Sequence, residues 1–361
     1  MYKLIAALAF ASLAFAQHDT AGQPPEGKLA EQVYKNIVEL KGVPADQIGP
    51  AMQFISASLG VNCEFCHVQG KFDADDKGAK KTAREMIAMQ NTINKNAFRG
   101  RTQVTCNSCH RGASHPVGVP QVLESDAMPG AAGMGAPPAG GAQGPTADQV
   151  LEKYVTASGG AEAMGKVTSR AMKGNILVGG NSTPIEVLTK APNKRVSISQ
   201  MGGNNSYTAF DGTAGWLGTT GRPARDMSAA ESAASSIDAE FYLPLRLKEI
   251  FPQLRRGRPE TVNGAECEVL NGSAPGKPAV RLYFDKSTGL LTRLVRYADT
   301  PLGRNPTQID YADYKTVDGV TIPMRWTLAR PNGRFTIQLT DVKSNAPIDD
   351  ARFAKPVGEV K

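Results

Sequence analysis

The sequence is poor in cysteine, histidine and aromatic residues, and it has no long apolar run beyond its first residues. Its 361 residues include five cysteines, four histidines and two tryptophans, and aromatic side chains make up 6%. No later segment approaches the about 20 apolar residues that a membrane-spanning helix needs. No interleaved basic and aromatic pattern occurs, so nucleic acid is not an expected partner despite a net charge of +7. One cysteine, Cys267, lies alone in a strand-like run, and we expect a small buried residue there rather than a reactive thiol.

The other four cysteines share one spacing. They form two copies of Cys-x-x-Cys-His: Cys63, Cys66 and His67, then Cys106, Cys109 and His110. In this motif the two thiols add to the vinyl groups of a haem, and the adjacent imidazole becomes the proximal iron ligand. A zinc ribbon would need only cysteine pairs, and a redox dithiol would occur once after a strand. The repeat therefore favours two covalently bound c-type haems, with zinc or dithiol chemistry as the alternative.

The first residues have the pattern of an export signal. Lys3 precedes an apolar run at 4–15, and Ala14-Phe15-Ala16 resembles the cleavage site of a secretory signal peptide. The run is too short for a transmembrane helix, although an uncleaved anchor is the alternative. Because c-type haems are attached on the outer side of the bacterial cytoplasmic membrane, export agrees with the motifs. We expect an exported, periplasmic protein, either free or membrane-associated.

Composition divides the chain into four parts. Residues 1–16 are the predicted signal peptide, and residues 17–115 hold both haem motifs. Residues 116–145 are dominated by proline, glycine and alanine, which predicts a flexible, disordered linker. Residues 146–361 begin with helical segments and continue as short strand-like segments joined by Asp-Gly and Asn-Gly turns. The expected fold is therefore multidomain, with a small all-α dihaem cytochrome domain, a linker, and an α+β domain built on an antiparallel sheet.

Apolar periodicity places the helices. In the haem region, helical patterns occur at 29–40, 46–60 and 79–94, so that helices alternate with the two attachment motifs. In the C-terminal part, one helical stretch at 228–250 interrupts the series of strands. Haem, rather than aliphatic side chains, must then supply much of the core of the small domain.

The distal iron ligands must come from a short inventory of methionine and histidine. Met52 lies on the helix that leads into the first motif, with a small residue one turn before it, and we expect it to bind the first iron. A small residue one turn back lets a helix lie close to a macrocycle. Met86 has Ala83 in this place, whereas Met89 has the bulkier Met86 behind it. Met86 is therefore the preferred ligand of the second iron, Met89 the second choice, and His115 a third.

The haem region resembles the cytochrome subunit family of photosynthetic reaction centres. The resemblance covers about residues 29–116 and is carried by segments at 52–67, 72–76, 80–89, 93–94 and 104–112. In that family a helix with the distal ligand precedes each attachment motif, which is the order found here. The resemblance implies a carrier of electrons between redox partners. Purple-bacterial members have four haem motifs, whereas this chain has two and then a β-rich region.

Charge and side-chain chemistry limit the function further. The net charge of +7 suits an acidic redox protein or an anionic membrane surface as partner. No general acid or base accompanies the haem motifs, so we expect an electron carrier rather than an enzyme. An iron with an open coordination position would instead favour a peroxidase-like activity.

The C-terminal region resembles the periplasmic lipoprotein-carrier (LolA/LolB-like) fold. Short turn and strand segments carry this resemblance, at 282–285, 288–291, 317–320 and 348–350. It implies a curved antiparallel sheet that wraps around helices and holds acyl chains. Four aromatic residues could line such a cavity, with ordinary core packing as the competing expectation: Trp216, Trp326, Phe241 and Tyr242. The alternative function is therefore a lipid- or quinone-binding carrier or sensor domain with an attached dihaem electron-transfer module.

Overall fold

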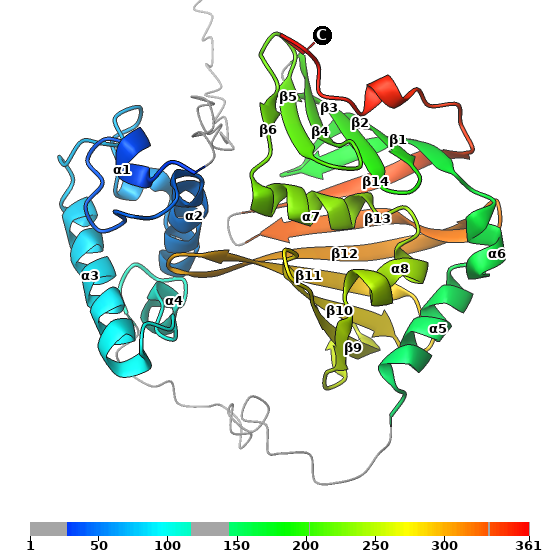
Figure 1. The fold of residues 1–361 in the computed structure, drawn as a ribbon, viewed down its shortest axis with the longest axis horizontal. Coiled ribbons are helices and arrows are strands. Elements are labelled where there is room, and N and C mark those ends of the chain that lie inside the picture. Colours follow the sequence, from blue (N-terminus) through cyan, green and yellow to red (C-terminus); the bar gives the residue numbers. More distant parts are fainter. Residues whose placement is uncertain (1–26, 117–143, 202, 331–332, 361) are drawn as a thin grey trace, which may run out of the picture.

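The computed structural model describes residues 27–116, 144–201, 203–330 and 333–360. The predicted signal peptide, and all of the predicted linker except residues 116, 144 and 145, lie outside these ranges. The described residues form a helical region, 27–116, and a sheet region, 144–360 (Figure 1).

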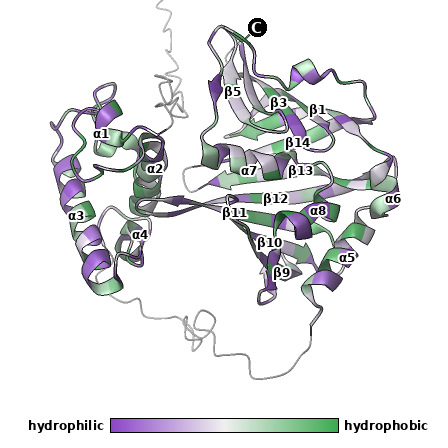
Figure 2. Ribbon diagram, in the orientation of Figure 1, coloured by the Kyte–Doolittle hydropathy of each residue, from purple (hydrophilic) through white to green (hydrophobic). Residues whose placement is uncertain are grey.

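Four helices make up the described helical region, together with two 3-10 turns. They are α1 (Ala30–Val33), α2 (Ile48–Leu59), α3 (Gly78–Phe98) and α4 (Cys106–His110), with 3-10 turns at Ala45–Gln47 and Cys63–Phe65. α2 ends at Gly60 and α3 at Arg99, both in the left-handed conformation. Figure 2 shows that α2 is largely hydrophobic, whereas α3 carries long hydrophilic stretches. α2 is therefore the better suited of the two to lie in an apolar core.

The predicted helix at 29–40 is wrong beyond its first turn. α1 stops after Val33 because Tyr34 is extended and Asn36 has a positive φ of 59°. The Glu31 carboxylate accepts a hydrogen bond from the backbone N–H of Gly42 at 2.9 Å, which folds the following segment back onto α1. Apolar spacing was present, but the chain satisfies its backbone groups through turns instead.

The sheet region contains fourteen antiparallel strands in one sheet, in the order β6-β5-β4-β3-β2-β1-β14-β13-β12-β11-β10-β9-β7, with β8 paired to β9. The strands are β1 Ser169–Val178, β2 Asn181–Lys190, β3 Lys194–Met201, β4 Asn204–Phe210, β5 Gly215–Thr219, β6 Arg225–Asp226, β7 Gln253–Arg256, β8 Glu260–Val262, β9 Ala265–Ser273, β10 Ala279–Asp285, β11 Leu291–Thr300, β12 Gly303–Val317, β13 Val320–Arg330 and β14 Gly333–Ser344. The first and last strands, β1 and β14, pair in the middle of the sheet. The predicted antiparallel sheet is confirmed, and Figure 1 shows that it is strongly curved.

Helices α5 (Ala147–Ala157), α6 (Gly160–Gly165), α7 (Ala229–Ala239) and α8 (Leu243–Ile250) pack against this sheet. Leu247 and Phe251 are fully buried with side chains of β9 to β11, and Trp326 lies between this cluster and a second one around Val187. Cys267 is also fully buried, as expected. The sheet region thus has an extensive apolar core of its own.

A long hairpin joins the two regions. The tip of the β11–β12 hairpin, residues 298–305, is called the arm below, and it reaches α2 of the helical region (Figure 1). Leu302 on the arm is 1% exposed and belongs to the apolar cluster of the helical region. Gly303 lies so close to the Phe54 ring that no Cβ would fit, and the Asn305 side-chain amide donates to Pro50 O at 3.0 Å. The helical region therefore completes its core with a residue of the sheet region.

No helix in the part of the chain that the structure describes is both long and apolar enough to cross a membrane.

Candidate haem-binding sites

The first Cys-x-x-Cys-His segment lies in a tight turn directly after α2. Asn62 caps this turn, because its Oδ1 accepts from the Phe65 N–H at 3.2 Å. The backbone N–H groups of Cys66 and His67 both donate to Cys63 O, at 3.3 and 3.0 Å. Cys63 is exposed and Cys66 half-buried, and burial raises the pKa of the Cys66 thiol. The two thiols are therefore held together on one short turn, with that of Cys63 at the surface.

The His67 ring is fixed in one tautomer. Its Nδ1 lies 2.9 Å from the backbone oxygen of Phe72. Because a carbonyl only accepts hydrogen bonds, Nδ1 carries the proton and Nε2 keeps a free lone pair. Burial lowers the pKa of His67, and the cations of Lys80 and Arg84 lower it further. A neutral imidazole with a free Nε2 is the form that binds iron.

The second motif repeats this arrangement. The motif forms the short helix α4. The Asn94 side chain on α3 holds the segment that precedes α4. It accepts hydrogen bonds from the N–H groups of Gln103 and Val104 at 3.0 and 2.9 Å and donates to Val104 O at 2.7 Å. His110 Nδ1 lies 3.0 Å from Ala113 O, so its Nε2 is free by the same argument. Each predicted proximal ligand thus has a backbone carbonyl behind it.

Gly60 brings the two motifs together. It stands three residues before Cys63 in the left-handed conformation, and a Cβ there would collide with Gly112 O, two residues after His110. Gly112 N–H donates to Ser58 O at 2.8 Å, which fixes the contact. Glycine is required both by the helix end and by this close approach. The two attachment turns are consequently neighbours in the fold.

The structure places the candidate distal ligands around these turns. Met52 is half-buried on α2, at the edge of the apolar cluster that Cys106 also contacts. Met86 and Met89 on α3 are 37% and 47% exposed. Gln90 Oε1 is 3.2 Å from the Cys106 thiol, so Gln90 lies on the side of α3 that approaches the second motif. Met86 stands one helical turn before Gln90 and therefore lies on the same side. His115 is exposed beyond α4.

Most of the exposed large apolar side chains lie in the helical region. Of the eight large hydrophobic side chains that are exposed among the described residues, six belong to the helical region: Tyr34, Val38, Phe65, Phe72, Met86 and Met89. An excess of exposed apolar side chains in one region indicates a candidate binding surface. A haem macrocycle is a flat apolar group with two ligand positions, so the thiols, the free Nε2 atoms and this apolar surface together fit it. The described residues contain no group of three or more His, Cys, Asp or Glu side chains suited to one metal ion, as a zinc site would need.

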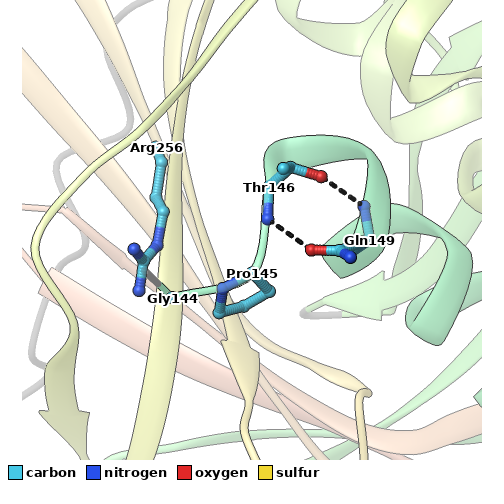
Figure 3. Close-up of a pocket in the computed structure, with 5 residues that line it drawn as sticks. All are labelled: Gly144, Pro145, Thr146, Gln149 and Arg256. Carbon is cyan, nitrogen blue, oxygen red and sulfur yellow. Dashed lines mark hydrogen bonds between the residues drawn. The ribbon is translucent and has the colours of Figure 1, made fainter. Parts of the chain in front are cut away.

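Two cavities on the sheet region have a different character. One of about 490 Å³ lies where the chain enters α5 and is lined by residues that Figure 3 shows: Gly144, Pro145, Thr146, Gln149 and Arg256. Thr146 and Gln149 cap the helix reciprocally, and the Arg256 guanidinium is paired with Glu268 at 3.0 Å. The second, of about 330 Å³, also has polar and charged walls. These walls suit neither an acyl chain nor a nucleophilic reaction.

The four aromatic residues proposed for a lipid cavity pack as core. Phe241 and Tyr242 contact each other edge to face with ring centroids 5.1 Å apart, and the indole N–H of Trp216 donates to Phe353 O at 2.8 Å. Trp326 packs against both large apolar clusters of the sheet region. These four aromatic residues therefore follow the competing expectation, which is ordinary core packing.

Comparison with known proteins shows a similarity that covers the helical region. Residues 7–149 match the family described as "Photosynthetic reaction centre cytochrome C subunit". This is a family of c-type cytochromes, which supports haem as the cofactor. The N-terminal part of the chain thus resembles this family, as the motifs predict.

Two curated relatives show the extent of the likeness. The photosynthetic reaction center cytochrome c subunit of Thermochromatium tepidum is 32% identical over 94 residues, which is 25% of this chain and 23% of that protein. The corresponding subunit of Roseobacter denitrificans is 32% identical over 106 residues, 26% of this chain and 28% of the relative. The chain thus spans about a quarter of the length of these relatives.

Solved structures resemble the other region. A LolA superfamily protein from Nitrosomonas europaea is 14% identical, with a TM-score of 0.40, and the match covers 59% of this chain and 99% of that one.

Proposed function

We propose that this protein is an exported dihaem c-type cytochrome that carries electrons between redox partners. Cys63 and Cys66 would hold one haem with His67 as proximal ligand, and Cys106 and Cys109 would hold the other with His110. Met52 and Met86 are the proposed distal ligands, with Met89 as the second choice for the second haem. The bound haem supplies a one-electron couple between ferric and ferrous iron.

The single observation that carries this proposal is the repeated hydrogen bond behind each histidine. His67 follows a 3-10 turn and His110 ends a short helix, yet each Nδ1 faces a backbone carbonyl at 2.9 to 3.0 Å. Such a bond orients the ring and directs Nε2 outward, which is the usual arrangement for a histidine that ligates a metal. A structural histidine would not need the same geometry twice.

The fold also supports transfer between the haems. The contact of Gly60 with Gly112 keeps the two attachment turns adjacent. The exposed Cys63 and Cys109 lie at the surface, so each haem edge would be open to a partner. Electrons could then enter at one haem and leave at the other without large motion of the chain. The expected partners are redox proteins, in the periplasm or at a membrane surface.

The test is a redox titration of the full chain, produced with c-type maturation factors. The proposal predicts two reversible one-electron steps, low-spin spectra in both states, and no reaction of the ferrous or ferric protein with peroxide. A high-spin, five-coordinate haem that turns over peroxide would instead establish a peroxidase-like enzyme. Fractionation of the producing cells would show whether the mature chain is periplasmic.

One observation favours a second function in the sheet region. Arg195, Arg296 and Arg330 all lie within electrostatic reach of the Asp238 carboxylate, which pairs with Arg296. Glu231 also acts on Arg330, but it pairs with Arg225. The Arg195 guanidinium also lies 5.8 Å from the centroid of the Trp326 ring. This excess of positive charge beside an apolar core suits an amphipathic anion better than a neutral quinone. Native mass spectrometry of the full chain should then show a co-purified acidic lipid, and a clean protein mass unaltered by added anionic lipid would refute this second function.

A further inference from the structure

The carbonyl behind His67 has a second partner. Phe72 O accepts from His67 Nδ1 at 2.9 Å and also from Lys80 Nζ at 3.0 Å. Lys80 stands near the start of α3 and is only 8% exposed, which is rare for lysine. Its ammonium group also donates to Ala74 O at 2.8 Å. A buried cation therefore shares its acceptor oxygen with the proximal imidazole.

The local charges leave this cation only partly neutralised. Asp75 Oδ1 lies 3.1 Å from Lys80 Nζ, but the same carboxylate also accepts from Arg84 at 2.9 Å. One carboxylate thus serves two cations. The Asp75 side chain is 40% exposed, whereas that of Lys80 is 10% exposed, so solvent screens the anion more than the cation.

The second motif lacks this feature. Ala113 O accepts from His110 Nδ1 at 3.0 Å, and no lysine or arginine of the described residues donates to that oxygen. The two proximal histidines therefore differ in one defined respect. The first has a carbonyl shared with a buried cation, and the second has a carbonyl of its own.

We infer that Lys80 is a positioning residue that raises the reduction potential of the haem attached at Cys63 and Cys66. This inference rests on the proposed function. By drawing electron density from Phe72 O, Lys80 weakens the bond that the oxygen accepts from His67 Nδ1–H, which leaves the imidazole a poorer donor to iron. Its charge also opposes the additional positive charge of the ferric state. Both effects favour ferrous iron at the first haem, and the hydrogen-bond effect is confined to it, because the carbonyl behind His110 is not shared with Lys80.

The experiment replaces single lysines in the full, haem-loaded chain. Lys80→Met removes the cation and keeps the length of the side chain, and its expected effect is a fall in the potential of one haem only. We expect the ferrous-to-ferric ratio at a fixed ambient potential to drop about tenfold, equivalent to about 59 mV for one electron. Lys81→Met is the matched control, because Lys81 is the exposed neighbour on the same helix and carries the same charge. Lys80→Arg keeps the positive charge, so the potential of the first haem should stay close to that of the wild type.

Each outcome separates the inference from the proposed function. The inference is wrong if Lys80→Met retains two haems and leaves both potentials unchanged. It is also wrong if Lys81→Met changes the haem potentials by as much as Lys80→Met does. In both cases the proposed function stands. If the wild-type chain takes up no haem, the proposed function itself fails. If Lys80→Met loses its first haem, Lys80→Gln, which keeps a hydrogen-bond donor without charge, provides the measurement. To assign the shifted potential, Lys80→Met is combined with Cys106→Ala and Cys109→Ala in the full chain. This variant keeps only the first haem, so a lowered potential in it belongs to that haem.

Discussion

The helical and sheet regions bury apolar surface in very different amounts. The sheet region has several connected clusters, with fully buried phenylalanine and leucine side chains such as Phe251, Phe284 and Leu270. The described helical region buries seven apolar side chains of its own, three of them alanine, and takes an eighth, Leu302, from the arm. It also exposes most of the large hydrophobic side chains that the structure leaves exposed.

This difference indicates how each region is stabilised. A small unit with so few buried side chains gains little from the hydrophobic effect, so a bound cofactor or a covalent attachment usually supplies the rest. The sheet region needs no such help. We therefore expect haem and the arm to determine the stability of the helical region, while the sheet region folds independently of both.

The largest expected effect comes from withholding haem. In a full chain with all four motif cysteines changed to alanine, we expect α2 and α3 to lose nearly all protection from amide hydrogen exchange, because the apolar surface around the motifs stays uncovered. Strands β9 to β11 should exchange as slowly as in the wild type. Equal protection of α2 with and without haem would show that the helical region is self-sufficient.

A smaller effect is expected from truncating Leu302, the buried residue of the arm. Leu302→Ala should destabilise the helical region by about 2–4 kcal/mol, since it removes a fully buried side chain from a thin core. Urea unfolding followed by the haem absorption measures this change. Arg304→Ala on the same arm is the control: its side chain is 63% exposed and pairs with an exposed Asp299, so a change below about 1 kcal/mol is expected. If the two variants behave alike, the arm does not contribute to the helical core.

The distal ligands give a local effect. Met52→His should lower the potential of one haem, because imidazole favours ferric iron more than a thioether does. Met86→Ala should abolish the near-infrared band of one Met–His pair and leave haem attachment intact. Met89→Ala is the matched control on the same helix. If Met89→Ala abolishes the band and Met86→Ala does not, the second choice is the ligand; if neither does, His115 becomes the candidate.

Sequence reasoning located the attachment residues but not their supports. The motifs identify Cys63 and His67 by spacing alone, since the chemistry requires these residue types together. Asn94 and Gly60 had only weak signals, because an asparagine and a helix-end glycine are common. The partner of Asn94, Val104, follows a loop that sequence does not define, and the partner of Gly60, Gly112, is distant in sequence.

Long-range contacts explain the other differences. The role of Lys80 has no sequence signal, because sequence does not show that its ammonium group donates to Phe72 O. The arm lies between two predicted strands and was not itself predicted, since periodicity does not reveal that Leu302 is buried in another region. The strand pattern did predict the antiparallel sheet, because alternation and Asp-Gly turns are local signals.

The smallest expected effect is a dependence on pH. Hydrogen bonds from Arg84, Asn36 and Lys80 hold the pKa of Asp75 well below its ordinary value. A depressed carboxyl pKa in the folded state stabilises the fold above the unfolded pKa of about 4, and this contribution is lost as pH falls below that value. Asp75→Asn should therefore weaken the helical region slightly near neutral pH, and the difference from wild type should shrink on acidification to about pH 3. A difference that stays constant over this range in urea unfolding would contradict this assignment.

The number of haems per chain tests the central claim most directly. The full chain, produced with c-type maturation factors, should contain two covalently attached haems by the pyridine haemochrome assay and by intact mass. The Cys63→Ala, Cys66→Ala and the Cys106→Ala, Cys109→Ala variants should each contain one. A wild-type chain without covalent haem, or with the same haem content as either variant, would contradict the account.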